Sequence, residues 1–172
     1  RGVASGRLID GEVGAFRKSL RERLTSALGH DIRVERGNGG LALDRKALAD
    51  TGIALEDASD VLLEVVREIA PVHPWIEAVY GFHEIAALYG AATGLDGLMR
   101  DSFHPERVTD VVLLQSPNLL LGMRNGTSHG THHWYDRHVP LVLYGPGFEA
   151  TRRSDAVGSQ DVLPTLLGQL GV

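Results

Sequence analysis

Histidines gather in one short stretch of this 172-residue chain. Four of the eight histidines lie within residues 126–138, which read Gly-Thr-Ser-His-Gly-Thr-His-His-Trp-Tyr-Asp-Arg-His. Neutral imidazole is the commonest zinc ligand, and a loop between two buried strands holds such a ligand firmly. Glycines on both sides of His129 let the backbone come close to a metal or an oxyanion. The stretch therefore indicates a metal site, with a solvated surface loop as the alternative.

The neighbours of His129 have supporting roles in this interpretation. The hydroxyl groups of Thr127 and Ser128 are placed to fix the tautomer of the imidazole ring through hydrogen bonds. His132 and His133 are expected either to line a substrate pocket or to lie solvated on the loop.

The remaining histidines and charges near the loop favour structural roles. His138 precedes an apolar run and is expected to be a hydrogen-bonded structural residue. Asp136 and Arg137 are expected to form a local ion pair or loop contacts. His104 is expected to fix the turn in which it lies. The other histidines give no functional signal; they are His30, His73 and His83.

The first part of the chain is predicted to fold as a hairpin with helices. Apolar residues at intervals of three and four predict amphipathic helices, and short apolar runs on either side of an Asn-Gly pair predict a β-hairpin. The predicted elements are a helix at 12–28, strands at 32–35 and 41–43, a helix at 56–70, a strand at 75–81 and short helices around 83–91 and 95–101.

The second part of the chain is predicted to supply strands of a buried sheet. The apolar run at 111–114 is typical of a strand buried on both faces, and 119–121 is expected to extend it. The apolar run at 139–144 predicts another buried strand. A final helix is expected to begin near Asp161, with Pro164 in its first turn, where a missing N–H has no cost. The fold class is therefore mixed α/β.

Composition narrows the class of partner. A net charge of −5 argues against a nucleic-acid-binding surface, because phosphate backbones are held by clustered Lys and Arg. No apolar run is long enough for a membrane span. Without cysteine, a metal must be held by His, Asp, Glu or hydroxyl oxygen. The chain begins Arg-Gly-Val, so we expect that processing or a cut removed an earlier part, and a targeting segment with it.

The order of these motifs resembles that in the C-terminal part of proteins of the alkaline phosphatase superfamily. The likeness is closest to the branch of type I phosphodiesterases, nucleotide pyrophosphatases and single-chain bacterial alkaline phosphatases. It is carried by Gly-Thr-Ser-His-Gly at 126–130, Tyr-Asp-Arg-His-Val-Pro-Leu at 135–141, Tyr-Gly-Pro-Gly at 144–147 and Asp-Val-Leu-Pro-Thr-Leu-Leu at 161–167. Segments 41–45, 103–107 and 110–112 look like those that precede the His motif in such phosphatases, so the resemblance covers about residues 40–172.

This resemblance implies the C-terminal part of an α/β/α sandwich with an inserted hairpin-and-helix region. Residues 1–109 would form the inserted α+β region, and residues 110–172 the closing strands and helix of the phosphatase core. The family is a two-zinc hydrolase of phosphate esters, in which two metals clamp an in-line displacement. Its zinc-binding His maps onto His129. The resemblance to this family also implies that the protein is periplasmic or secreted.

The chain departs from the family in what it lacks. The family's N-terminal Asp, its nucleophile, its Asp-x-x-x-His pair in a suitable context and its Asp-His pair do not occur here. A catalytic zinc needs three protein ligands as a rule, so His129 alone does not make a working site. We therefore expect no catalytic residue in this chain and no activity from it alone. The phosphate ester would bind through the missing N-terminal part.

Two other hypotheses remain open. One is a self-contained zinc-binding module that uses His129 with His132, His133 or His138. The other is a noncatalytic interaction domain that shares the fold, because function resides in sites rather than in folds. The sequence leaves the oligomeric state and the choice of ester undecided.

Overall fold

The fold is that of a computed structural model, which describes residues 6–8, 11–37, 39–88, 93–121, 125–127 and 129–171. The chain divides into two compact units, residues 1–138 and residues 139–172. Each unit is described by itself.

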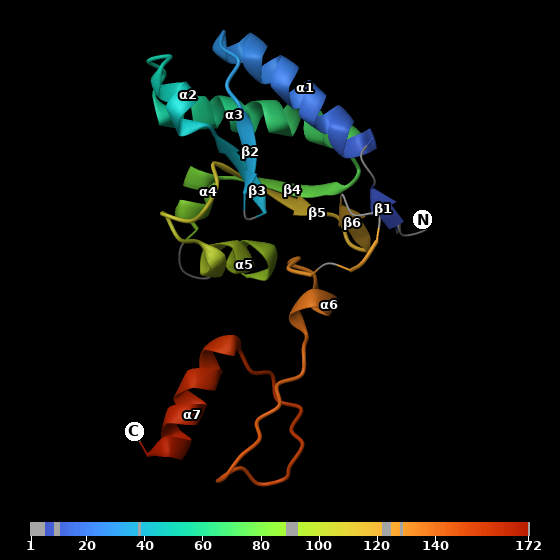
Figure 1. Cartoon of the computed structure of the whole chain (residues 1–172), viewed down its shortest axis with the longest axis vertical. Coiled ribbons are helices and arrows are strands. Elements are labelled where there is room, and N and C mark those ends of the chain that lie inside the picture. Colours follow the sequence, from blue (N-terminus) through green and yellow to red (C-terminus); the bar gives the residue numbers. More distant parts are fainter. Residues whose placement is uncertain are drawn as a thin grey trace. The chain divides into compact units, whose positions relative to one another are not determined.

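A four-stranded antiparallel sheet is the centre of the first unit (Figure 1). Its strands, in spatial order, are β2 (Val34–Gly37), β3 (Gly40–Leu43), β5 (Val111–Gln115) and β4 (Ile76–Gly81). The predicted hairpin is confirmed, with Gly37 opposite Gly40; its Asn38 lies outside the described residues. Gly40 is required there, because a Cβ would collide with the carbonyl oxygen of Val111 on the neighbouring strand.

Two long helices cover one face of this sheet (Figure 1). They are α1 (Gly11–Leu28) and α3 (Leu55–Ile69), at the positions that apolar spacing predicted. Phe16, Leu20 and Leu24 of α1 are buried at intervals of four, so one stripe of the helix faces the core. They meet Leu62 of α3 and Val111 of β5 in the main apolar cluster.

A smaller apolar cluster covers the opposite face. It joins Ile85 of α4 (Phe82–Ala86), Met99 of α5 (Gly94–Ser102) and Leu114 of β5. Strand β5 therefore packs against apolar side chains on both faces, as its run of apolar residues predicted. The predicted helix at 83–91 is shorter in the structure, and its residues 89–91 lie outside the described part of the chain. A short helix, α2 (Arg45–Ala49), follows the hairpin and is capped by the Asp44 carboxylate.

Strand β4 contains a bulge at Glu77. Ile76 pairs with Gln115 and Ala78 pairs with Leu114, so no residue of β5 is left to pair with Glu77. Ile76 packs in the main cluster, while Ala78 packs in the smaller one on the other face. Regular alternation would put both on one face, and the extra residue accounts for the change.

Residues 119–121 form a separate strand, so the prediction that they extend β5 is wrong. Strand β6 (Leu119–Leu121) pairs in parallel with β1 (Gly6–Leu8) in a two-stranded sheet. Asn118, with φ of 61°, turns the chain away from β5, and its carbonyl accepts a hydrogen bond from the Gly6 amide at 3.1 Å. Asn tolerates this left-handed conformation better than most residues.

The second unit contains helix α7 (Val162–Leu170) and a long irregular segment. The helix begins after Asp161, as predicted, and the Asp161 carboxylate accepts a hydrogen bond from the Gly158 amide at 2.7 Å. The prediction of a strand at 139–144 is wrong for this structure, because no described residue pairs with that segment. Val142 and Tyr144 are 81% and 99% exposed.

Strand β5 pairs with β3 and β4, which precede residue 109, so the two sequence regions share one sheet. The division into domains 1–109 and 110–172 stays a prediction. Among the described helices, none has the length and apolarity needed to cross a bilayer.

Candidate functional site

The segment of residues 125–133, named the histidine loop, lies between β6 and a single turn of helix, α6 (Trp134–Arg137). Gly126 and Gly130 have φ of 88° and 91°, values at which a side chain would be strained, so both glycines are needed for the path of the backbone. His129 lies between them and is exposed. Ser128, which was expected to contact its ring, lies outside the described residues.

Contacts within the loop fix its shape. The backbone amide of Thr131 donates to the Asp136 carboxylate at 2.9 Å, and the Thr131 hydroxyl donates to the same oxygen. The two hydrogen bonds from Thr131 lower the pKa of Asp136, with a further contribution from His129. Arg137 donates from Nε to the His132 carbonyl at 2.7 Å. The expectation that Asp136 and Arg137 make loop contacts is confirmed.

His132 and His133 are largely buried, so the expectation that they lie solvated on the loop is wrong, whereas His132 lines a cavity, as the alternative expected. Their side chains are 11% and 10% exposed. His132 Nε2 lies 3.0 Å from Oε2 of Glu77 on β4, and His133 Nε2 lies 2.9 Å from the Gln115 carbonyl oxygen on β5. Burial, and then the neighbouring His133, lower the pKa of His132, although Glu77 opposes this shift. The loop is therefore docked on the end of the sheet.

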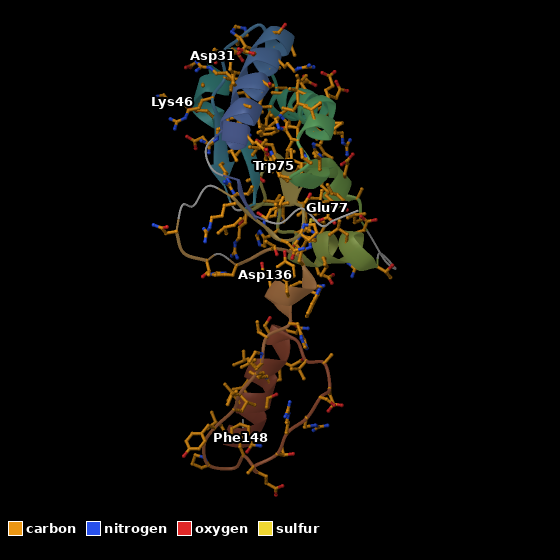
Figure 2. The ribbon with its side chains drawn as sticks, turned by 90° about the vertical axis from the view of Figure 1, so that its right-hand side faces the viewer. Asp31, Lys46, Trp75, Glu77, Asp136 and Phe148 are labelled. Carbon is orange, nitrogen blue, oxygen red and sulfur yellow. The ribbon has the colours of Figure 1, made fainter. Side chains whose placement is uncertain are left out.

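Tyr135 holds the other side of the loop. Its ring stacks on His133 with a centroid distance of 5.3 Å and an angle of 24°. Its hydroxyl oxygen accepts a hydrogen bond from the Asn118 amide at 2.9 Å. The turn between β5 and β6 thus contacts the same loop that Glu77 contacts. Figure 2 labels Glu77 on the sheet and, below it, Asp136 of α6.

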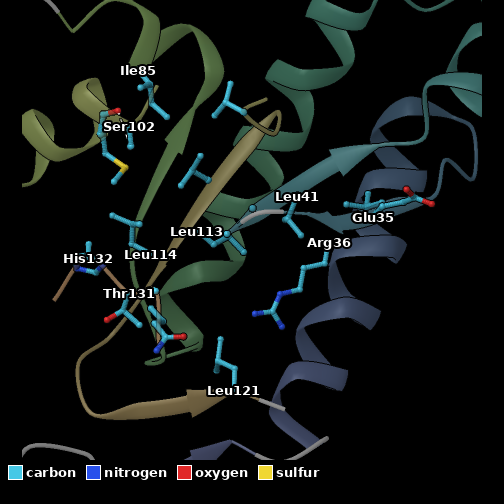
Figure 3. Close-up of a pocket in the computed structure, with 18 of the residues that line it drawn as sticks. Glu35, Arg36, Leu41, Ile85, Ser102, Leu113, Leu114, Leu121, Thr131 and His132 are labelled. Carbon is cyan, nitrogen blue, oxygen red and sulfur yellow. Dashed lines mark hydrogen bonds between the residues drawn. The ribbon is translucent and has the colours of Figure 1, made fainter. Parts of the chain in front are cut away.

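A cavity of about 1340 Å³ opens beside this loop. Figure 3 shows Arg36 directed into it, with Leu113 and Leu114 of β5 behind and Thr131 and His132 on the opposite side. His129 also lines the cavity. Its lining includes the arginines Arg17, Arg21, Arg33, Arg36, Arg107 and Arg137, and the acidic residues Asp31 and Glu35. Because cationic groups outnumber carboxylates over an apolar floor, the cavity suits an organic anion.

His104 and His73 make structural contacts through their side chains, whereas His138 does so through its backbone. His104 Nδ1 accepts a hydrogen bond from the Glu106 amide at 3.3 Å, which confirms its expected role in a turn. His73 is buried with its ring edge-to-face against Phe16 at 5.3 Å. His138 ends α6 through its backbone N–H, which donates to the Trp134 carbonyl at 2.7 Å, while its side chain is exposed.

One group of three potential metal ligands occurs among the described residues, and it is not centred on His129. It consists of Glu77, His132 and His133, whose ligand atoms lie within 4.8 Å of one another. Sequence analysis missed Glu77. The local sequence gives one signal for it. In the predicted strand 75–81, alternation places the charged Glu77 on the same face as the apolar Val79, where a carboxylate is unexpected.

Sequence comparison finds relatives among alkaline phosphatases, although no protein-family model matches the chain. Alkaline phosphatase PafA from Elizabethkingia meningoseptica is 24% identical over 163 residues, which are 93% of this chain and 29% of PafA. Alkaline phosphatase PhoK from a Sphingomonas species is 27% identical over 127 residues, which are 68% of this chain and 22% of PhoK. The chain spans less than a third of the curated relatives that it matches.

Structure comparison agrees. The crystal structure of wild-type PafA matches 91% of this chain with a TM-score of 0.74 and 22% identity, over 30% of the PafA chain. A PafA variant with four substitutions matches 90% of the chain with a TM-score of 0.73. The chain has the fold of part of an alkaline phosphatase. The mixed α/β class predicted from sequence is confirmed. The sequence relatives are alkaline phosphatases, which agrees with the resemblance to that superfamily. The assignment of His129 as a zinc ligand stays a prediction.

Proposed function

We propose that this chain is the C-terminal part of a zinc-dependent phosphoric ester hydrolase and that His129 supplies one ligand to its two-zinc centre. The observation that carries the proposal is the position of His129. It lies between two glycines, at the edge of an arginine-lined cavity, in a fold that matches an alkaline phosphatase over most of the chain. Zinc beside such a cavity would hold a phosphoryl oxygen and activate the attacking group.

In this proposal the chain is part of a longer protein, which contains the remaining metal ligands and the nucleophile. That longer protein hydrolyses a phosphate ester. The motif order at 126–147 supports the branch of type I phosphodiesterases, nucleotide pyrophosphatases and single-chain bacterial alkaline phosphatases. Because His129 is one ligand and a catalytic zinc needs about three, the isolated chain is inactive. The same family likeness supports a periplasmic or secreted location.

Exposed apolar residues in the second unit support a place in a larger core. Val142 and Tyr144 of the predicted strand are exposed, and so are Leu163 and Leu170 of α7. Monomeric proteins rarely leave contiguous apolar surface in water, and such surface marks an interface. In the proposal, residues 110–172 complete the sheet and outer helix layer of the phosphatase core, while residues 1–109 are its inserted region.

The test is hydrolysis of p-nitrophenyl phosphate by the longer protein and by the 172-residue chain. We expect activity only from the longer protein, with loss on zinc chelation and recovery on zinc addition. His129→Ala should lower kcat/KM by at least about 100-fold, because it removes a metal ligand. His30→Ala, at an exposed histidine outside the cavity lining, is the matched control. A fully active His129→Ala enzyme would contradict the proposal.

A further inference from the structure

Three potential ligands from distant parts of the sequence meet beside the histidine loop. Glu77 lies on β4, and His132 follows 55 positions later. One ligand atom from each of Glu77, His132 and His133 lies within 4.8 Å of the other two. We propose that these three residues bind a zinc ion at a site separate from His129. The site stands on its own geometry and does not depend on the proposed hydrolase activity.

The bulge in β4 places the carboxylate of this site. In a regular strand, Glu77 would share a face with Val79, which packs in the main apolar cluster. The extra residue between Ile76 and Ala78 interrupts that alternation, and the Glu77 carboxylate instead reaches His132 at 3.0 Å. Bulges commonly re-aim one side chain beside a functional site.

The donor set is one that zinc accepts. Two imidazoles and one carboxylate are the protein ligands of a three-ligand zinc site with one open position. The ring nitrogen of His133 that faces the site is Nε2, which lies 3.6 Å from the Glu77 carboxylate and 2.9 Å from the Gln115 carbonyl oxygen. Zinc at this nitrogen would take the place of the hydrogen bond to that carbonyl.

The imidazoles are held in place before any metal binds. Their ring centroids are 4.0 Å apart, and both Nε2 atoms lie within 3.6 Å of the same Glu77 oxygen. Tyr135 stacks on His133, and Arg137 donates to the backbone of His132. A preorganised site loses little side-chain freedom on binding. Zinc here would fasten the histidine loop to β4 and would keep one coordination position open to water.

The test is calorimetric titration of the 172-residue chain with zinc chloride, with thermal unfolding of each variant as the check on folding. The wild-type chain should bind one zinc at this site and unfold at a higher temperature when zinc is present. Glu77→Gln keeps the size of the side chain and its hydrogen bond to His132, yet it should weaken binding by at least about 100-fold. His132→Asn should do the same.

His129→Ala is the matched control, since it removes a histidine of the same loop outside the proposed site. Zinc affinity that survives in His129→Ala and is lost in Glu77→Gln supports the proposal. Affinity lost in His129→Ala and kept in Glu77→Gln overturns it and assigns the metal to His129. Absence of zinc binding by the wild-type chain also overturns it and leaves Glu77 as a hydrogen-bond partner only. These outcomes are independent of phosphatase activity, which is measured on the longer protein.

Discussion

Arg45 binds the carboxylate of Asp110 through two hydrogen bonds of 2.9 and 2.7 Å, although the two residues are 65 positions apart. The Asp110 side chain is 6% exposed and also accepts from the Leu43 amide at 2.8 Å. Both residues lie in segments that resemble phosphatases in sequence, at 41–45 and 110–112. Their pairing joins the end of the hairpin to the start of β5.

Loss of this pair should destabilise the first unit. Asp110→Ala leaves the Leu43 amide and the Arg45 guanidinium without their acceptor, so we expect a cost of about 3 kcal/mol in the free energy of unfolding. Urea unfolding followed by the fluorescence of buried Trp75 measures it. Arg23→Ala, which breaks an exposed pair with Glu68 in the same unit, should cost less than about 1 kcal/mol. Equal costs for the two variants would show that Asp110 is not a structural anchor.

Helix α7 gives a test of the larger core. Leu163→Ala should change the free energy of unfolding of the 172-residue chain by less than about 0.5 kcal/mol, because the side chain is exposed. In the longer protein the same change should cost about 2–5 kcal/mol, as for a buried leucine. Leu62→Ala, at a fully buried position of α3, should cost about 2–5 kcal/mol in both. A silent Leu163→Ala in both proteins would exclude α7 from a larger core.

The local pattern of apolar residues was enough to predict the helices and strands whose buried face is apolar. Helices α1 and α3 and strands β3 and β5 all have apolar residues at the positions that are buried. The strand predicted at 139–144 failed for a different reason. Its apolar run reflects burial against partners, and no described residue supplies one. The pattern of apolar residues indicates that a segment is buried, but it does not indicate which other segment covers it.

The candidate site was predicted only in part, because its contacts are long-range. The clustering of histidines drew attention to this loop, and its interpretation as a metal site stays a prediction. The burial of His132 and His133 depends on Glu77 and Gln115, which lie on strands far from them in sequence. The bulge that aims Glu77 depends in turn on pairing with β5, which no local signal reveals.

Asp136 should act as a positioning residue for His129. Asp136→Ala removes the acceptor of both Thr131 hydrogen bonds, so the loop around His129 loses its internal tie. We expect kcat of the longer protein to fall by about 10–100-fold, as for outer contacts of metal ligands. Steady-state kinetics measures this effect, with the urea midpoint as the control. Asp136→Asn should recover part of the activity, because its amide oxygen still accepts. Full activity in Asp136→Ala would refute the role.

Glu84 should make the thermal stability of the chain depend on pH in the acidic range. Burial raises the pKa of Glu84, but hydrogen bonds from the Gly81 amide and the Arg67 guanidinium outweigh it and hold the pKa below its ordinary 4.5. The carboxylate therefore stabilises the fold above pH 4.5 and loses this effect as pH falls through the lowered pKa. Thermal unfolding should separate wild type from Glu84→Gln at pH 7, and the difference should shrink as the pH falls below 4.5. Glu22→Gln, in the exposed pair with Lys18, is the control. A difference that does not change with pH would contradict the assignment.

The most direct test of the account is anomalous X-ray diffraction at the zinc edge from crystals of the longer protein. The account predicts a zinc peak about 2.1 Å from a ring nitrogen of His129, within a centre completed by ligands from outside this chain. Zinc bound elsewhere with His129 unligated, in an enzyme that hydrolyses phosphate esters, would contradict the central claim.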